Sequence, residues 1–295
     1  MKKDKVKENA SLFDRYADML ISTALAEDVS SGDITTEATV PAGEQAQARL
    51  VAKEGFIVAG LDIAEKTFRK MSAEVVFTQL VSDGDYAKKG TALATLKGPA
   101  RAILTGERVA LNFMQRLSGI ATHTRAFIDR VKGVDVTLLD TRKTTPCMRI
   151  LERYAVKVGG AKNHRFGLFD AILIKDNHIL AAGGVEKAIK AVRKNYSKKA
   201  PIEVEVSNQR ELREALKANA DIIMLDNMDA ARIKSALKII DGRAVTEASG
   251  GIDLDNIRAI AETGVDCISI GSLTHSARAM DISLKFGAGE PKGLR

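Results

Sequence analysis

The sequence predicts an α/β fold: an incomplete TIM-like α/β barrel with an N-terminal α/β sandwich domain. Three observations support this prediction. Six short apolar runs occur in the second half of the chain, helical patterns separate them, and the first half shows short strand patterns around one helix. Short apolar runs that alternate with helices are typical of buried parallel strands joined by right-handed crossovers. Six such strands fall short of the eight in a full barrel.

Each run ends at a polar residue, a charged residue or a glycine. The runs are Val136–Leu139 before Asp140, Ala171–Ile174 before Lys175, Ile202–Val206 with Glu203 and Glu205, Ile222–Leu225 before Asp226, Val245–Ala248 before Ser249, and Cys267–Ile270 before Gly271. Functional residues collect at the carboxyl ends of strands in such sheets. We therefore expect these side chains to converge on one mouth that holds a charged, hydroxylated ligand.

The first half predicts a smaller layer of helices and short strands. A helix is expected over 11–27, and a turn cluster follows at 28–33. Short strands from about residue 46 to 96 surround a helix at Asp62–Met71, and Arg101–Leu117 has a strong helical pattern.

A domain boundary is expected near residue 115, where the pattern changes without a Pro- or Ser-rich linker. The predicted N-terminal domain covers 1–115 and the predicted catalytic barrel covers 116–275. The segment 276–295 is expected to pack back on the N-terminal domain.

The helices of the second half have recognisable ends. Ser207 is expected to cap a helix that continues to about Asn219, and the next helix covers Asp229–Ile240. Asp253 is expected to cap Leu254–Glu262, which ends before Gly264.

Composition limits the classes of function. The net charge is +7 and the pI is about 9.3, which fits an acidic small ligand, nucleic acid or anionic lipid. Most basic residues are spread out, including those of the N-terminal KKDKVK and of Lys190–Lys199, and we expect solvated faces there. Aromatic residues make up 4% and tryptophan is missing, which argues against base stacking and a nucleic-acid partner.

No apolar run is long enough to cross a membrane, and no apolar core follows the basic N-terminus as in a secretory signal. Cys147 and Cys267 give neither a disulfide framework nor metal-ligand spacing. We therefore expect a cytoplasmic protein without a membrane partner. Residues 81–93 are similar to half of a biotinyl or lipoyl carrier repeat, and Lys70-Met71 is similar to the site of a carrier lysine. However, Lys70 lies in a helical pattern rather than on a hairpin tip, and the second half-repeat is missing.

A dense basic segment is the strongest chemical signal. Arg142, Lys143, His164, Arg165 and Lys175 occur within one loop-rich stretch. Arginine binds carboxylate or phosphate with two parallel hydrogen bonds, and lysine binds them as a point charge. The segment therefore predicts an anion site, and the alternative is an exposed basic loop with scattered salt bridges.

Two glycine-containing loops follow the last two strands. They are Ala248–Gly251 and Ile270–His275, and a backbone without side chains lets N–H groups approach a phosphate closely. The alternative is a pair of simple tight turns.

Glu205 and Asp226 are carboxylates at successive strand ends. They suit ribose hydroxyls or hydrated magnesium, or else serve as counter-ions of Lys143 and Lys175.

Together these motifs resemble the quinolinate phosphoribosyltransferase family, also called carboxylating nicotinate-nucleotide pyrophosphorylases. The resemblance runs through nearly the whole chain and rests on Asp140–Pro146, Asn163–Arg165, Leu173–His178, Glu203–Val206, Met224–Asn227, Glu247–Ile252, Ala24–Val29, Gly32–Thr36, Ala59–Asp62 and Glu107–Asn112. Cys147 and Ala161 stand where such enzymes usually have glycine. The departures remove no charged group.

The resemblance implies a reaction of NAD biosynthesis. Quinolinate and phosphoribosyl pyrophosphate would give nicotinate mononucleotide, pyrophosphate and carbon dioxide, with Mg2+. It also implies a homodimer at minimum, in which each active site takes Arg108 from the neighbouring chain.

The implied site residues fall into groups by substrate. Arg142, His164, Arg165 and Lys175 would bind quinolinate, with Thr141 beside them, Lys143 would approach the pyrophosphate, Glu205 and Asp226 would hold ribose hydroxyls or the metal, and Ser249, Gly250, Gly251 and Gly271 would hold the 5-phosphate. Lys143, Lys175, Glu205 and Asp226 are the implied catalytic residues.

Three other functions remain open from the sequence. One is a sister phosphoribosyltransferase of the same fold with another acid acceptor, such as those linked to molybdenum metabolism. The second is a Schiff-base aldolase that uses Lys175, and the third is a basic nucleic-acid-binding protein.

Overall fold

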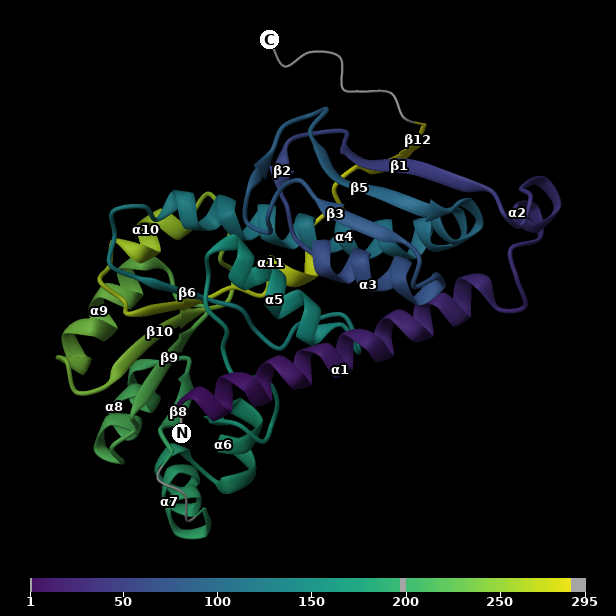
Figure 1. Ribbon diagram of the computed structural model, residues 1–295. Helices are drawn as coiled ribbons and strands as arrows, with labels where there is room; N and C mark the ends of the chain where they lie inside the picture. Colours follow the sequence, from purple (N-terminus) through teal and green to yellow (C-terminus); the bar gives the residue numbers. More distant parts are fainter. Residues whose placement is uncertain (1, 197–199, 288–295) are drawn as a thin grey trace. The chain divides into compact units, whose positions relative to one another are not determined.

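The computed structural model describes residues 2–196 and 200–287, and its contacts group into two compact units (Figure 1). The first, called the sheet unit, contains the chain up to His123, Thr145–Gly159, and the chain from Ser276. The second, called the barrel unit, contains Thr124–Thr144 and Gly160–His275. Among the described residues no helix is long and apolar enough to cross a membrane.

The change between the units falls inside helix α4, Ala100–Arg130, which continues beyond the predicted helix end at Leu117. The sequence-based boundary near residue 115 therefore lies within the same helix but earlier. Helix α5, Arg149–Gly159, belongs to the sheet unit by its contacts, although the sequence placed it in the barrel domain. Of the C-terminal segment, residues 288–295 lie outside the described residues.

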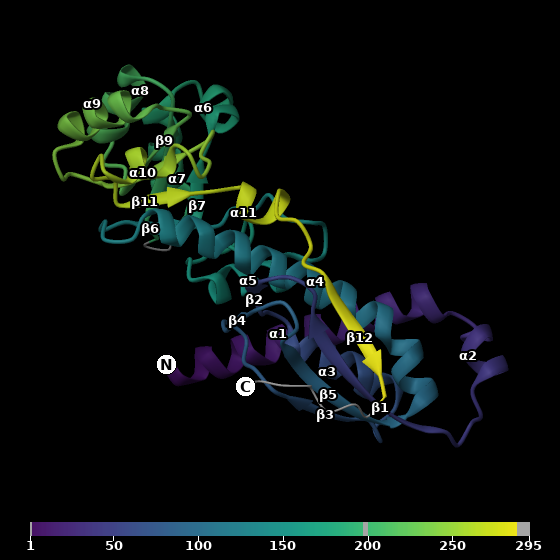
Figure 2. The same ribbon diagram turned by 90° about the horizontal axis from the view of Figure 1, so that it is seen from above.

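The sheet unit is built on a four-stranded antiparallel sheet in the order β12-β1-β5-β3. Its strands are β1 (Gln45–Ala52), β3 (Val76–Gln79), β5 (Ala92–Pro99) and β12 (Ile282–Phe286). Figure 2 shows β12 alongside β1, where Leu50 is opposite Leu284. This pairing explains how the C-terminal segment returns to the first half of the chain.

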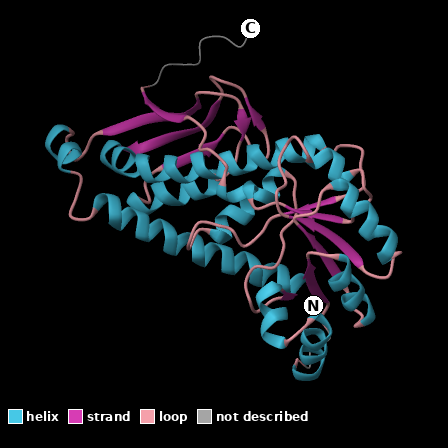
Figure 3. Cartoon of the chain, turned by 180° about the vertical axis from the view of Figure 1, so that it is seen from behind, coloured by secondary structure: helices cyan, strands magenta, loops and turns pink. Residues whose placement is uncertain are grey.

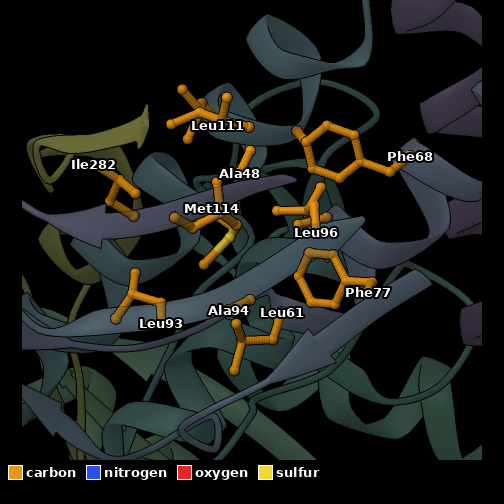
Figure 4. Close-up of a cluster of buried hydrophobic side chains, with 14 of the residues drawn as sticks. Ala48, Leu61, Phe68, Phe77, Leu93, Ala94, Leu96, Leu111, Met114 and Ile282 are labelled. Carbon is orange, nitrogen blue, oxygen red and sulfur yellow. The ribbon is translucent and has the colours of Figure 1, made fainter. Parts of the chain in front are cut away.

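Helices and a small second sheet complete this unit. They are α1 (Lys2–Val29), α2 (Ile34–Thr39), α3 (Leu61–Met71), the first part of α4, α5, and the strand pair β2 (Phe56–Ile57) and β4 (Tyr86–Ala87). Figure 3 shows helices along one face of this sheet. Leu96 and Ala94, two residues apart on β5, belong to the same buried cluster as residues of α3 and α4 (Figure 4). Phe68 of α3 is fully buried and stacks on Phe77, with ring centroids 6.2 Å apart.

The barrel unit contains six parallel strands in the order β6-β11-β10-β9-β8-β7. They are β6 (Thr137–Leu139), β7 (Ile172–Ile174), β8 (Ile202–Val206), β9 (Ile222–Asp226), β10 (Val245–Ser249) and β11 (Cys267–Ser269). The two edge strands, β6 and β7, are not paired with each other. A single parallel bridge joins Leu139 to Lys162 on the free side of β6. The predicted incomplete TIM-like barrel with a separate N-terminal α/β domain is confirmed.

Helices follow the strands along the chain. They are α6 (Asp176–Ala182), α7 (Val185–Asn195), α8 (Gln209–Lys217), α9 (Ala230–Ile240), α10 (Ile257–Ala261) and α11 (Ser272–His275). Figure 1 shows α8, α9 and α10 on the outer side of β8, β9 and β10. These helices carry fully buried residues such as Leu212 and Ile233.

Two helix starts differ from the prediction. Asn208, not Ser207, caps α8, because its side chain accepts hydrogen bonds from the N–H groups of Arg210 and Glu211. Asp253 accepts from the N–H groups of Asp255 and Asn256 in the turn before α10, so this helix begins later than expected. Asp229, the first residue of the predicted helix, is the N-cap of α9 and accepts from the N–H of Arg232.

Candidate active site

A cavity of about 730 Å³ opens where the six parallel strands end. Every residue that lines it belongs to the barrel unit. Twelve of the thirteen residues that the sequence singled out are among them: Thr141, Arg142, Lys143, His164, Arg165, Lys175, Glu205, Asp226, Ser249, Gly250, Gly251 and Gly271. The parallel sheet brings them together because all six carboxyl ends meet at one edge.

Arg142, Arg165 and Lys175 give the cavity a cationic side. Burial and the charge of Arg142 lower the pKa of Arg165, while the charges of Glu203 and Asp170 act in the opposite direction. The Nη1 of Arg165 donates to the carbonyl of Ala171 at 3.1 Å, and this hydrogen bond ties the guanidinium group to the residue just before β7. Two adjacent guanidinium groups are costly unless an anion joins them, so this side suits a ligand with more than one negative group.

Asp140 holds the basic segment in place but does not line the cavity. This carboxylate is fully buried and accepts from Asn163 Nδ2 at 2.6 Å and from the N–H of His164 at 2.7 Å. It thereby ties the end of β6 to the segment that carries His164 and Arg165. The expectation that all six strand-end polar residues face the mouth is therefore wrong for Asp140, because its oxygens are used within the wall.

Glu205 and Asp226 form an acidic side beside Lys175. The Nζ of Lys175 lies 3.3 Å from Glu205 Oε2. Burial and the charge of Asp226 raise the pKa of Glu205, and Lys175 opposes that shift. Two carboxylates beside one lysine can accept hydroxyl hydrogens or bind a hard cation.

The glycine loops expose backbone at positions where a side chain would be strained or would clash. Gly250 and Gly251 have φ values of +88° and +65°, and a Cβ on Gly250 would lie 2.3 Å from Asn227 Oδ1. A Cβ on Gly271 would lie 2.9 Å from Lys143 Cδ. The helices that follow are short, with five residues in α10 and four in α11. An anion in this part of the cavity would therefore meet backbone N–H groups of the loops rather than the dipole of a long helix.

Asn227 is a cavity residue that the sequence reasoning quoted but gave no role. Its φ of +52° is unusual for a residue other than glycine. Its Nδ2 donates to Asp226 Oδ2 at 2.7 Å, and its N–H donates to the carbonyl of Ser249 at 2.8 Å. Asn227 thus joins the carboxylate of β9 to the glycine loop after β10. A Leu-Asp-Asn sequence at a strand end is the signal that could have identified it.

His164, which lines the cavity, lies against two buried carboxyl groups, Glu203 and Glu247, to which the sequence reasoning gave no role. His164 Nε2 is 3.2 Å from Glu203 Oε2 and 3.6 Å from Glu247 Oε1. Glu203 is 4% exposed and Glu247 is 3% exposed. The alternation Ile-Glu-Val-Glu-Val could have identified Glu203, because residues two apart in a strand share a face and Glu205 lines the mouth.

One nitrogen or oxygen atom from each of these three side chains lies within 4.8 Å of the others, which is close enough to hold a metal ion. Within residues 2–196 and 200–287, this is the one group of three or more potential metal ligands at such spacing. The N–H of Arg165 donates to His164 Nδ1 at 2.7 Å, so the imidazole hydrogen sits on Nε2. An Nε2–H directed at two carboxylates is a donor and offers no lone pair to a metal. The geometry therefore favours a hydrogen-bonded cluster.

Arg108 is the predicted residue that does not line the cavity. It lies exposed on α4 in the sheet unit. Cys147 is exposed with a φ of +64°, and Lys70 lies on α3 rather than on a hairpin tip. The position of Lys70 removes the basis for a carrier function.

Comparison with known proteins identifies related families and structures. A family model described as the C-terminal domain of quinolinate phosphoribosyl transferase matches residues 120–285, and one described as its N-terminal domain matches residues 33–118. A Bacillus subtilis protein named probable nicotinate-nucleotide pyrophosphorylase (carboxylating) is 45% identical over 266 residues, which are 90% of this chain and 91% of that protein.

A solved structure and a plant protein with the same name are also similar to this chain. The nicotinate-nucleotide pyrophosphorylase from Francisella tularensis superimposes with a TM-score of 0.88 at 42% identity, over 92% of this chain and 96% of that one. The rice chloroplastic nicotinate-nucleotide pyrophosphorylase (carboxylating) is 43% identical over 90% of this chain and 76% of its own length.

Proposed function

The chain belongs to the quinolinate phosphoribosyltransferase family, and we propose that the cavity at the barrel mouth is its active site. The protein transfers a phosphoribosyl group from phosphoribosyl pyrophosphate to quinolinate with decarboxylation. The products are nicotinate mononucleotide, pyrophosphate and carbon dioxide, and the reaction belongs to NAD biosynthesis. The observation that supports this site best is the presence of a paired arginine side, a carboxylate side and a glycine side in one cavity.

The cationic side binds quinolinate in this proposal. Quinolinate is a rigid ring with two adjacent carboxylates, and it needs several convergent donors. Arg142, Arg165 and Lys175 supply them from three segments, while Thr141 and His164 complete the walls. The closeness of Arg142 and Arg165 favours a dicarboxylate over a monocarboxylate, because two neighbouring cations are balanced by two negative groups.

The carboxylate side and the glycine loops of the cavity bind phosphoribosyl pyrophosphate in this proposal. Glu205 and Asp226 accept hydrogen bonds from ribose hydroxyls, and Ser249, Gly250, Gly251 and Gly271 surround the 5-phosphate. Lys143 lies against Gly271 and carries the charge that meets the pyrophosphate. This arrangement sets the ribose between the leaving group and the ring nitrogen of the acid.

Magnesium fits the same carboxylates. Glu205 and Asp226 provide two hard oxygen ligands, and Mg2+ commonly keeps several waters and completes its shell with substrate phosphates. When bound, the ion would neutralise charge on the pyrophosphate. The prediction is that activity disappears with a chelator and returns with added Mg2+.

The residues then act mainly by placing charge. The bond from the ribose carbon to pyrophosphate breaks with its electrons on the leaving oxygen, near Lys143. The ribose gains positive character, which the carboxylates of Glu205 and Asp226 stabilise, and the ring nitrogen supplies the new bond. In the pyridinium product, the bond to the adjacent carboxylate breaks, its electrons stay on the ring carbon, and a proton from water completes the ring.

A coupled assay tests the proposed function. Purified protein, magnesium and phosphoribosyl pyrophosphate are combined with quinolinate or with nicotinate, and nucleotide and carbon dioxide are both measured. We expect one carbon dioxide per nucleotide with quinolinate and no turnover with nicotinate. Turnover of a different acid by folded protein, without turnover of quinolinate, would assign the chain to a sister enzyme with another acceptor.

We also propose a homodimer with shared active sites, in which Arg108 serves the partner's cavity. Arg108 is exposed on α4 and is not among the residues that line the cavity of its own chain. Arg108→Ala and Lys175→Ala proteins should each be inactive, and a mixture after subunit exchange should regain part of the activity. The control is Lys190→Ala in place of Arg108→Ala. If exchange is demonstrated and no activity returns, Arg108 does not act across chains.

A further inference from the structure

The cluster of His164, Glu203 and Glu247 has a hydrogen-bond pattern that leaves two carboxylate oxygens without a partner. Glu203 Oε1 and Glu247 Oε1 have no hydrogen-bond donor among the described residues. Both carboxyl groups are almost fully buried, where an unpaired charged oxygen is unfavourable. A proton carried by one carboxyl group would reduce this like-charge repulsion.

His164 cannot readily take that proton. Burial alone lowers its pKa, but the hydrogen bond to Glu203 and the charge of Glu247 outweigh burial and raise the pKa above its usual value. However, a second ring proton would have to sit on Nδ1, where the N–H of Arg165 already donates at 2.7 Å. The neutral imidazole with its hydrogen on Nε2 is therefore favoured, and the titrating proton goes to the carboxyl groups.

Glu247 is the carboxyl group best placed to hold it. Burial and the charge of Glu203 raise the pKa of Glu247 to about 7 even when a charged His164 and Lys175 oppose the shift, and a neutral imidazole removes the first of these opposing charges. On the β11 side Cys267 stays a thiol, because burial and Glu247 raise its pKa to about 11. On the far side of His164, the buried carboxylate of Asp140 is occupied by Asn163 and by the His164 N–H.

The cluster is electrically connected to the acid-binding cations. Lys175, which lines the cavity, acts on Glu247, and Arg165 follows His164 directly and responds to the charge of Glu203. A dianion bound to these cations offsets the charge of Lys175, which opposes protonation of Glu247. Glu247 then becomes easier to protonate.

We propose that Glu203 and Glu247 are positioning residues for the acid-binding side: they hold the His164 ring in one orientation, and Glu247 takes up a proton when a dianionic acid binds. This inference rests on the proposed function, because it takes a dicarboxylate as the ligand. Its consequence is that acid binding weakens as pH rises above about 7, although both carboxylates of the ligand stay ionised throughout that range.

Calorimetry with phthalate, a dicarboxylate that lacks the reacting ring nitrogen, measures the proton directly. Binding enthalpies at pH 7.5 are compared in buffers of low and high ionisation enthalpy, and the slope gives the protons taken up per site. We expect uptake of about half a proton or more in the wild-type protein and close to none in Glu247→Gln. Glu262→Gln, a surface change on α10, should behave like the wild type.

Kinetics supply a second readout that a merely structural role would not change. With saturating donor, the wild-type KM for quinolinate should rise several-fold between pH 7 and 8.5. The Glu247→Gln protein should lose that dependence while kcat changes little. If Glu247→Gln fails to fold, Glu203→Gln replaces it, since loss of the neighbouring charge should reduce proton uptake at pH 7.5.

The outcomes separate this inference from the proposed function. Binding of phthalate without proton uptake by the wild type, or equal uptake by wild type and Glu247→Gln, overturns the role of Glu247. If the folded protein binds neither phthalate nor quinolinate at any pH, the proposed acceptor is wrong, and the inference falls with it.

Discussion

The core of the sheet unit and the mouth of the barrel unit follow opposite rules. In the core, apolar side chains such as Leu50, Phe68 and Leu96 are fully buried against one another. At the mouth, four cationic side chains and three carboxylates line one cavity, and Asn227 has a left-handed backbone conformation. The first arrangement stabilises the fold by removing apolar surface from water, and the second maintains charges ready for a ligand.

The difference teaches where stability and activity should separate. Core residues act through burial, so their loss should change the free energy of unfolding and leave the chemistry of folded molecules intact. Mouth residues are partly exposed and paired over short distances, so their loss should change activity with little effect on folding.

Phe68→Ala should have the largest effect on stability. Its ring is fully buried and stacks on Phe77, so its removal leaves a cavity that costs about 3–5 kcal/mol in the free energy of unfolding. The folded fraction should keep its wild-type kcat, measured after correction for unfolded protein. Phe286→Ala is the matched control, because this side chain is 43% exposed and its loss should cost far less. A stable variant with a reduced kcat would break the separation of the two regions.

Lys175→Ala should have the largest effect on activity. The variant removes a cation between the acid-binding arginines and Glu205, and kcat/KM should fall by about 10²–10³-fold. The free energy of unfolding should change by less than about 1 kcal/mol, since the pair is partly exposed. Lys190→Ala, which removes a surface pair with Glu186, is the control for both measurements. A large loss of stability would mean that Lys175 supports the fold.

Asn227→Gly should have a smaller effect on activity, and this effect should be confined to the binding of phosphoribosyl pyrophosphate. Glycine accepts the backbone conformation but lacks the amide that donates to Asp226. We expect the KM for phosphoribosyl pyrophosphate to rise about tenfold, the loss of one hydrogen bond of about 1.4 kcal/mol, while the KM for quinolinate stays within twofold. Asn219→Gly is the control, because Asn219 also has a positive φ but does not line the cavity. Equal increases in both KM values would show that Asn227 supports the whole mouth.

The same contrast explains what could be predicted from the sequence. Strand positions and their end residues followed from short apolar runs, because burial on both faces leaves a direct pattern. The place within α4 where the two units change, between His123 and Thr124, could not be predicted in this way, because α4 is one continuous helix through both units. The assignment of α5 to the sheet unit rests on long-range contacts, such as that of Tyr154 with Asp83, which no local pattern reveals.

At the site, the gathering of charged residues followed from parallel strand ends, but the direction of each side chain did not. Asp140 and Lys175 both follow an apolar run, yet the first is fixed within the wall and the second lines the cavity. The partner of each group decides this, and Asn163 lies 23 residues from Asp140. Glu203 and Glu247 form one cluster only because β8 and β10 flank β9 in the sheet.

A crystal structure of the protein with phthalate and phosphoribosyl pyrophosphate would test the central claim most directly. The account predicts that the two carboxylates lie against Arg142, Arg165 and Lys175, with the 5-phosphate in the loops that contain Gly250 and Gly271. It would be contradicted if the dicarboxylate occupied the glycine loops, or if neither ligand entered the barrel mouth under conditions in which the protein is active.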